Sequence, residues 1–195
     1  MSRADVAEPR PLTLLYVGRL AAEKSVEIVL RAFQHARDAL PAGSIRLVIA
    51  GTGPRERALR AKAPEGTTFL GHLDRDRDLP QLFANADLFL FASCTETLGL
   101  VVLEALASGL PVIATPVGGV AEHLRHGING VAVPERDPIA MAAAIIRLVK
   151  DPKARRQLAV GARKSAVDLG WEAELDRLDA IYRRVLVSGR PPLAS

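Results

Sequence analysis

Short apolar segments alternate with longer segments of helical periodicity along the chain, and this alternation constrains the fold more than any other feature. Between Ser25 and Leu40, for example, apolar residues recur at helical spacing. Strands that are apolar on both faces and joined through helices form parallel sheets with helices on either side. The sequence therefore predicts an α/β fold with one doubly wound parallel sheet. The expected strands are Leu12–Val17, Ile45–Ala50, Thr67–Leu70, Leu88–Phe91, Val112–Ala114 and Gly130–Val133.

Start signals and apolar spacing define the helices between and after these strands. Asp137 and Asp151 each precede a proline, which favours a helix start because Asp caps the first amides and Pro suits the first helical position. The last third of the chain is therefore expected to be mostly helical. The expected helices are Ser25–Leu40, Arg55–Ala63, Leu79–Ala84, Gly99–Ser108, Val120–Arg125, Pro138–Lys150, Pro152–Asp168 and Trp171–Leu186.

The length of 195 residues suits one domain, since domains usually contain about 100–200 residues. Hydrophobic residues make up 49% of the chain, which is enough for a core. We expect residues 1–11 to form a disordered tail, residues 12–188 a single Rossmann-like ligand-binding domain, and residues 189–195 a loose C-terminal tail.

Composition argues against several classes of protein. The net charge of +4 is spread along the chain and aromatic residues make up only 4%, so the basic patch of a nucleic-acid-binding protein is missing and we expect no nucleic acid. Cys94 is the only cysteine, which excludes an internal disulfide. His123 and His126 have no third ligand nearby, so we expect no metal. With no signal-peptide pattern and no membrane span, we expect a cytoplasmic protein that can contact the inner face of the membrane.

The first candidate site is the loop Gly18-Arg19-Leu20-Ala21-Ala22-Glu23-Lys24, directly after the first expected strand. Open parallel sheets bind ligands at the carboxyl ends of their strands. Gly18 lets the backbone approach a ligand closely. Arg19 and Lys24 add two cations just before a helix, an arrangement that suits a diphosphate. The alternative is a basic loop whose two cations are simply solvated.

A second glycine-rich turn, Gly51-Thr52-Gly53-Pro54, follows the second expected strand. It begins like a dinucleotide-binding fingerprint, but Glu56 stands where the third glycine belongs. We therefore reject the dinucleotide interpretation and predict a tight strand-to-helix turn beside a ligand cleft.

The third candidate site combines Glu96 with Glu104. Glu104 is the only charge on a helix that is apolar nearly all round, so the helix is expected to be buried. A buried carboxylate without a partner costs several kcal/mol, so either an arginine or ligand hydroxyls should pair with Glu104. Glu96 precedes the helix in a loop of hydroxyl side chains. Carboxylates bind sugar hydroxyls and helix N-termini bind phosphate, so the site suits a sugar joined to a phosphate.

These motifs together carry a resemblance to a known family. Glu96 and Glu104 have seven residues between them, and the motif Gly18-Arg19-Leu20-x-x-Glu23-Lys24 lies upstream. In this the chain resembles the retaining family-4 (group 1) glycosyltransferases of the GT-B fold. The similarity continues through residues 105–112 and 116–119 and covers the chain from Leu12 to Leu186. It implies that the chain is the C-terminal, donor-binding half of a GT-B fold.

The resemblance implies a nucleotide-sugar-binding domain that serves in transfer of a hexose from a nucleoside diphosphate sugar to a saccharide or lipid acceptor, with retention and without metal or other cofactor. Arg19 and Lys24 would hold the diphosphate, and Glu96 would touch the transferred sugar; these three are the expected catalytic residues. Glu104 would bind the ribose hydroxyls. The other expected donor-binding residues are Gly18, Gly51, Leu73, Thr97, Leu98, Gly99 and Leu100.

The chain also departs from the family pattern. Ser25 stands where the family commonly has glycine, and Thr97-Leu98-Gly99 replaces a Gly-aromatic-Gly form. The family's acceptor-binding domain precedes the donor domain and is not in this chain, so we expect transfer only with such a domain in cis or in trans. The apolar stripe of Trp171–Leu186 is then expected to be partly exposed, unless it packs on its own sheet.

Two other functions use the same residues. The chain could be a non-catalytic module that senses nucleotide sugars or contacts a partner protein. It could also be an epimerase or a phosphorylase of GT-B architecture, although the additional acid–base residues or cofactor lysine of those enzymes are not visible in the sequence.

Overall fold

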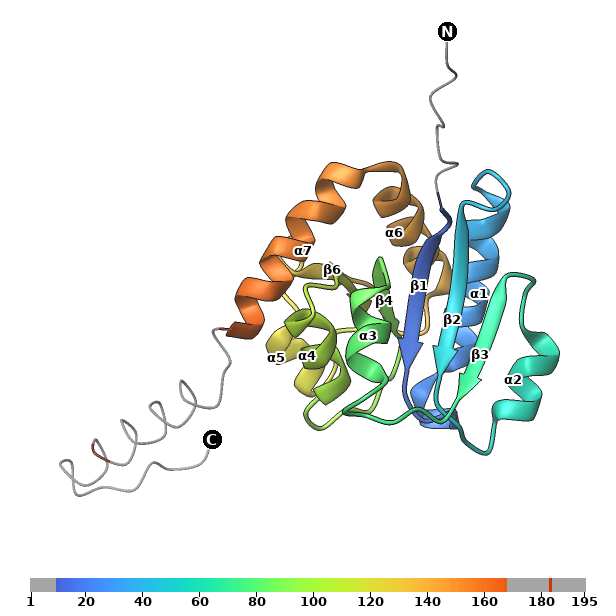
Figure 1. The fold of residues 1–195 in the computed structure, drawn as a ribbon, viewed down its shortest axis with the longest axis horizontal. Helices are drawn as coiled ribbons and strands as arrows, with labels where there is room; N and C mark the ends of the chain where they lie inside the picture. Colours follow the sequence, from blue (N-terminus) through green and yellow to red (C-terminus); the bar gives the residue numbers. More distant parts are fainter. Residues whose placement is uncertain (1–9, 168–182, 184–195) are drawn as a thin grey trace, which may run out of the picture.

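The computed structural model describes residues 10–167 and Arg183, and these residues form an open sheet flanked by helices (Figure 1). All neighbouring strands are parallel, in the order β3-β2-β1-β4-β5-β6. The predicted α/β class with a doubly wound parallel sheet is therefore confirmed. The strands are β1 (Leu12–Val17), β2 (Ile45–Ala50), β3 (Thr67–Gly71), β4 (Leu88–Phe91), β5 (Val112–Ala114) and β6 (Gly130–Ala132).

Helices cover the sheet on both sides. The strand order reverses between β1 and β4, so right-handed crossovers place α1 and α4 on opposite faces. Helix α1 packs against α6, and α4 packs against α7. The helical elements are η1 (Ala22–Lys24), α1 (Val26–Asp38), α2 (Glu56–Lys62), α3 (Leu79–Ala84), α4 (Leu100–Ala107), α5 (Gly119–His123), α6 (Pro138–Lys150) and α7 (Pro152–Val167).

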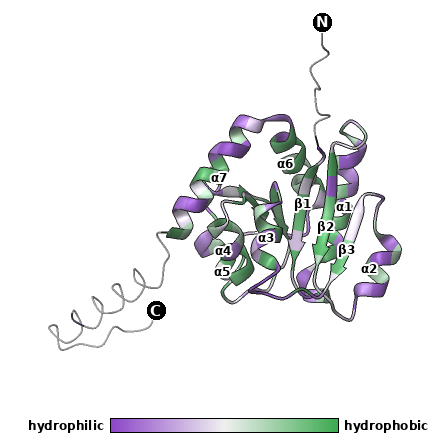
Figure 2. Ribbon diagram, viewed as in Figure 1, coloured by the Kyte–Doolittle hydropathy of each residue, from purple (hydrophilic) through white to green (hydrophobic). Residues whose placement is uncertain are grey.

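The hydrophobic core lies along the central strands. Strand β4 is buried at every position, and β1 at all but its first. Three aromatic rings pack in a row here: Tyr16 stacks on Phe91 with centroids 6.3 Å apart, and Phe91 on Phe89 at 6.1 Å. The edge strand β3 is less apolar, which Figure 2 shows as its paler colour beside β2. The centre of the sheet is thus a rigid support for the loops at its carboxyl end.

The expected elements agree with the structure to within two residues at each end wherever the chain is described, and β1, β2, β4, β5, α3 and α6 agree in full. The differences of one or two residues at the ends of the remaining elements are the usual uncertainty of helix and strand boundaries. The expected helix Trp171–Leu186 and both expected tails reach beyond the described residues, so those predictions stand untested. No helix in the described ranges is long and apolar enough to span a membrane.

The start of α6 allows a first prediction about stability. The Asp137 carboxylate accepts hydrogen bonds from the amides of Ile139 and Ala140, at 3.0 and 2.9 Å. Asp137→Ala removes both bonds and should lower the free energy of unfolding by about 1 kcal/mol. Urea denaturation measures this change. Asp137→Asn is the control and should recover most of the stability, because asparagine also caps helices; an equal loss in both variants would contradict the capping explanation.

Candidate functional site

The site lies at the carboxyl ends of β1 and β4, where the strand order reverses. Two adjoining cavities open there, each of about 430 Å³. Both are lined by Val17, Gly18, Arg19 and Leu79, which form their common border. Every residue predicted for the site lines one or both: the first contains Lys24, Glu96, Thr97, Leu98, Gly99, Leu100 and Glu104, and the second contains Gly51 and Leu73. The fold therefore brings the separate motifs into one cleft.

Glycines form the floor of this cleft because backbone segments cross there in direct contact. A Cβ atom on Gly51 would overlap with the carbonyl oxygen of Gly18. The Gly18 amide in turn donates to the Ala50 carbonyl at 3.0 Å, and the Leu20 amide to Thr52 at 2.9 Å. The turn after β2 thus holds the loop after β1 in place, as expected of a tight strand-to-helix turn beside a ligand cleft.

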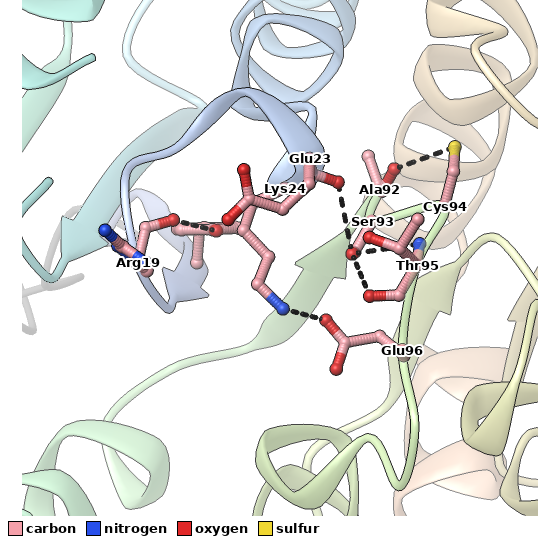
Figure 3. A network of polar contacts seen from close by, with 9 residues as sticks. Arg19, Glu23, Lys24, Ala92, Ser93, Cys94, Thr95 and Glu96 are labelled. Carbon is pink, nitrogen blue, oxygen red and sulfur yellow. Dashed lines mark hydrogen bonds and ion pairs between the residues drawn. The ribbon is translucent and has the colours of Figure 1, made fainter. Parts of the chain in front are cut away.

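Lys24 and Glu96 form an ion pair across the first cavity (Figure 3). Lys24 ends the short helix η1, and Glu96 lies in the loop after β4, 72 residues further along the chain. Ser93, which is fully buried, joins the same two segments: its hydroxyl lies 3.3 Å from the Glu23 carbonyl oxygen and 3.4 Å from that of Thr95. The two sides of the cleft are therefore held together by side chains as well as by the β1–β4 pairing.

The loop that carries Glu96 rests on a second pair of glycines. The Gly119 amide donates to the Glu96 carbonyl at 3.2 Å, and a Cβ atom on Gly118 would overlap with that same oxygen. Gly99 adopts a left-handed conformation with φ of 64° and precedes α4. Helix α4 begins at Leu100, which lines the first cavity together with Leu98, Gly99 and Val101, and the first amides of a helix have no acceptor within it. A negatively charged group would be favoured at this position.

Glu104 pairs with Arg75, so of the two partners expected for this carboxylate the structure shows the arginine. Arg75 comes from the loop between β3 and α3 and also lines the first cavity. The Glu104 side chain is 30% exposed and that of Arg75 is 61% exposed. An ion pair this accessible to water contributes at most about 1 kcal/mol, so ligand hydroxyls can compete for the carboxylate.

The prediction that α4 is buried all round is wrong. Only Val102, Ala105 and Leu106 are buried on this helix, whereas Leu100 is 49% exposed and Leu98, just before it, 60% exposed. One side of the helix lines a cavity and does not pack against other elements, and the apolar composition gave no sign of this. Glu104 lies on that open side, which explains how a charge is accommodated there.

Arg19 differs from the other cations of the cleft. It is exposed, lines both cavities, and has no carboxylate partner among the residues that the structure describes. Lys24 and Arg75 are both neutralised by glutamates. Arg19 therefore supplies the uncompensated positive charge at the junction of the two cavities. Within residues 10–167, no cluster of three or more potential metal ligands is present.

Two residues of the site, Arg75 and Tyr16, were not predicted from the sequence. Arg75 lies in a run of charged residues after β3, and its place at a strand's carboxyl end was a usable signal. Tyr16 acts through a hydrogen bond to the carbonyl of Arg19, three residues along the chain. Ser93 was expected among the hydroxyl side chains around Glu96, but its contact with the carbonyl of Glu23 could not be read from sequence spacing.

The fold and site together define a class of protein. The sheet is of the open parallel α/β class, whose members bind ligands beyond the strand ends at the switch point, and in this chain cations, carboxylates and a helix N-terminus gather there. The model of the family described as "Glycosyl transferases group 1" matches residues 11–151. The chain belongs to this glycosyltransferase family, as the resemblance implied.

Curated relatives support this membership. D-inositol 3-phosphate glycosyltransferase of Thermomonospora curvata is 38% identical over 181 residues, which cover 87% of this chain and 42% of that protein. Glycogen synthase of Mycobacterium tuberculosis is 34% identical over 188 residues, which cover 93% and 45%. The chain thus spans about two fifths of the length of the curated relatives it matches.

Solved structures show the same fold. Pneumococcal O-GlcNAc transferase GtfA in complex with UDP and GlcNAc aligns with a TM-score of 0.77 at 26% identity, covering 91% of this chain and 36% of that one. Sucrose-phosphate synthase from Thermosynechococcus elongatus gives 0.75 at 30% identity, covering 91% and 46%. Anabaena HepE in complex with UDP gives 0.72 at 25% identity, covering 80% and 44%.

Proposed function

We propose that this chain is the donor-binding half of a retaining glycosyltransferase, which transfers a hexose from a nucleoside diphosphate sugar to a saccharide or lipid acceptor. Its similarity to structures that contain UDP supports the nucleotide part of this proposal. The observation that carries it is the convergence of Arg19, Lys24, Glu96 and Glu104 on one cleft at the switch point of the sheet.

Each polar group has a place in the proposed complex. Arg19 and Lys24 bind the diphosphate, Glu96 contacts the transferred sugar, and Glu104 binds the ribose hydroxyls in place of Arg75. Gly51 and the backbone at Leu73 border the second cavity, where the nucleoside end fits. The amides of residues 98–100 lie at the start of α4 and reach the sugar or the phosphates.

The proposed chemistry depends on charge stabilisation. As the bond between sugar and phosphate breaks, negative charge builds up on the leaving diphosphate. Arg19, which has no carboxylate partner among the described residues, and Lys24, which is paired with Glu96, line the cavity where that diphosphate would lie. Preorganised charge of this kind is the main source of catalysis in many enzymes. We therefore propose that transfer proceeds without a metal ion.

We further propose that an acceptor-binding domain completes the enzyme, in cis or in trans. The curated relatives are more than twice as long as the matched region, which leaves room for a second domain in those proteins. A cytoplasmic location, with contact to the inner face of a membrane when the acceptor is a lipid, accords with this function.

Isothermal titration calorimetry with UDP, GDP and ADP tests the proposal. The chain is expected to bind at least one of them and to transfer no sugar by itself. Absence of binding to all three at millimolar concentration would contradict donor binding. Addition of a candidate acceptor domain separates the enzyme from the non-catalytic module: restored transfer supports the enzyme, and its absence with every plausible domain favours the module.

Removal of the Arg75 charge should change the affinity for UDP, and the direction of that change distinguishes two roles for this residue. If it competes with ribose for Glu104, Arg75→Gln should tighten UDP binding about two- to fivefold, because the ligand no longer displaces a cation. Calorimetry measures the change. Arg77→Gln is a matched control, since Arg77 pairs with Asp78 and lines neither cavity. Weaker UDP binding by Arg75→Gln would show instead that Arg75 itself binds the nucleotide.

A further inference from the structure

Tyr16 is a buried residue directly beneath the site. It is the penultimate residue of β1, is fully buried, and stacks on Phe91 in the core. Its hydroxyl group donates a hydrogen bond of 3.2 Å to the backbone carbonyl of Arg19, in the loop that follows β1. A phenylalanine would fill the same space, so the hydroxyl group has no packing role.

The Tyr16 hydroxyl leaves no room for a side chain at position 18. A Cβ atom on Gly18 would lie 2.9 Å from the Tyr16 oxygen, closer than side-chain atoms normally approach. Backbone hydrogen bonds hold Gly18 to Ala50 and Leu20 to Thr52, one on each side of Arg19. The Arg19 carbonyl lies between these two anchors and accepts its hydrogen bond from the Tyr16 hydroxyl, which secures this part of the loop.

The hydroxyl remains a donor at all working pH values. Burial, followed by the charges of Glu96, Glu23 and Glu27, raises the pKa of Tyr16 far above its ordinary value. The group is therefore protonated, and a buried hydroxyl needs a partner to offset its desolvation. The Arg19 carbonyl is the partner that the structure provides.

Orientation matters more for Arg19 than for the other cations of the cleft. Glu96 holds Lys24 and Glu104 holds Arg75, but no carboxylate orients Arg19 within the described part of the chain. The direction in which its side chain leaves the loop is therefore set by its backbone. The bond from Tyr16 fixes that backbone at the junction of the two cavities.

We propose that Tyr16 is a positioning residue, which orients Arg19 toward the diphosphate of the ligand through its hydrogen bond to the Arg19 carbonyl. This inference rests on the proposed function of the cleft. It predicts that the buried Tyr16 hydroxyl raises the affinity for the diphosphate and has no effect on the affinity for the nucleoside.

Tyr16→Phe tests the inference. The variant should bind UDP about three- to tenfold more weakly and uridine with unchanged affinity, because only the diphosphate contacts Arg19. Combined with Arg19→Gln, Tyr16→Phe should cause no additional loss. Ser44→Ala is the matched control: it also removes a hydroxyl that donates to a backbone carbonyl, that of Pro41 at 2.6 Å, but before β2 and away from the cleft.

Several outcomes would overturn the proposal. Equal losses for UDP and uridine, or additive losses with Arg19→Gln, would show a general structural role for the hydroxyl. The ligand-free chain gives an independent readout: in ¹⁵N spectra, Tyr16→Phe should shift the amide of Leu20 and the side-chain Nε of Arg19. Unchanged signals there would refute the inference. If the wild-type chain binds no nucleoside diphosphate, the proposed function fails, while these spectra still decide whether Tyr16 positions Arg19.

Discussion

The Arg19→Gln variant is expected to bind UDP about 10- to 100-fold more weakly than the wild-type chain, and uridine equally well. Arg19 lines both cavities and is the cation that no glutamate neutralises within the described residues. Loss of a hydrogen bond to a charged group costs about 1.5–3 kcal/mol, which corresponds to this range of affinity. Uridine lacks the phosphates, so its binding should not depend on the guanidinium.

Calorimetric titrations of the wild-type chain and of Arg19→Gln with UDP and with uridine measure this difference. Arg31→Gln is the control for the change in net charge, because Arg31 is exposed on α1 and lines neither cavity. Its affinity for UDP should match that of the wild type. A comparable loss in both variants would mean that phosphate affinity reflects overall charge, and the assigned role of Arg19 would then be wrong.

Gly118→Ala should destabilise the protein by about 3–5 kcal/mol, the largest effect expected from any single substitution considered. The new Cβ atom would overlap with the carbonyl oxygen of Glu96, and the residue has a φ of 53°, which side chains disfavour. Both the loop of Glu96 and the start of α5 would have to move. UDP-sugar binding should therefore fall together with stability.

Urea denaturation measures the loss, and Gly43→Ala separates its two causes. Gly43 also has a positive φ, of 75°, but an added Cβ atom there meets nothing within 4 Å. That variant should lose only the backbone term, about 1–2 kcal/mol. Equal destabilisation at both glycines would show that conformational strain, rather than overlap with Glu96, limits position 118.

The sheet and the residues that line the cleft could be predicted from the sequence, because both follow from local patterns. Apolar strands, the Asp137 cap and the glycine-rich turns depend on residues close together in the chain. The convergence of Arg19, Lys24 and Glu96 follows from one further rule, that parallel strands end at the same edge of a sheet. None of these predictions required knowledge of how side chains pack.

Ion pairing could not be predicted in the same way. The partner of Glu104 is Arg75, which comes from a different loop 29 residues away, and several other arginines were equally available by sequence. The exposure of Leu98 and Leu100 was also missed, because composition alone does not distinguish a helix side that packs from one that borders an open cavity. Both features depend on how loops from distant strands meet.

The pairing of β1 with β4 joins a segment near the start of the sequence to one near its middle, and the proposed binding residues lie in the loops that follow both strands. A nucleotide sugar held by Arg19 and Glu96 would therefore bind only when these two central strands are paired. By mass action, ligand at a hundredfold excess over its Kd would add about 2.7 kcal/mol of stability. Amide hydrogen exchange should slow throughout the sheet, at residues remote from the nucleotide as well as beside it.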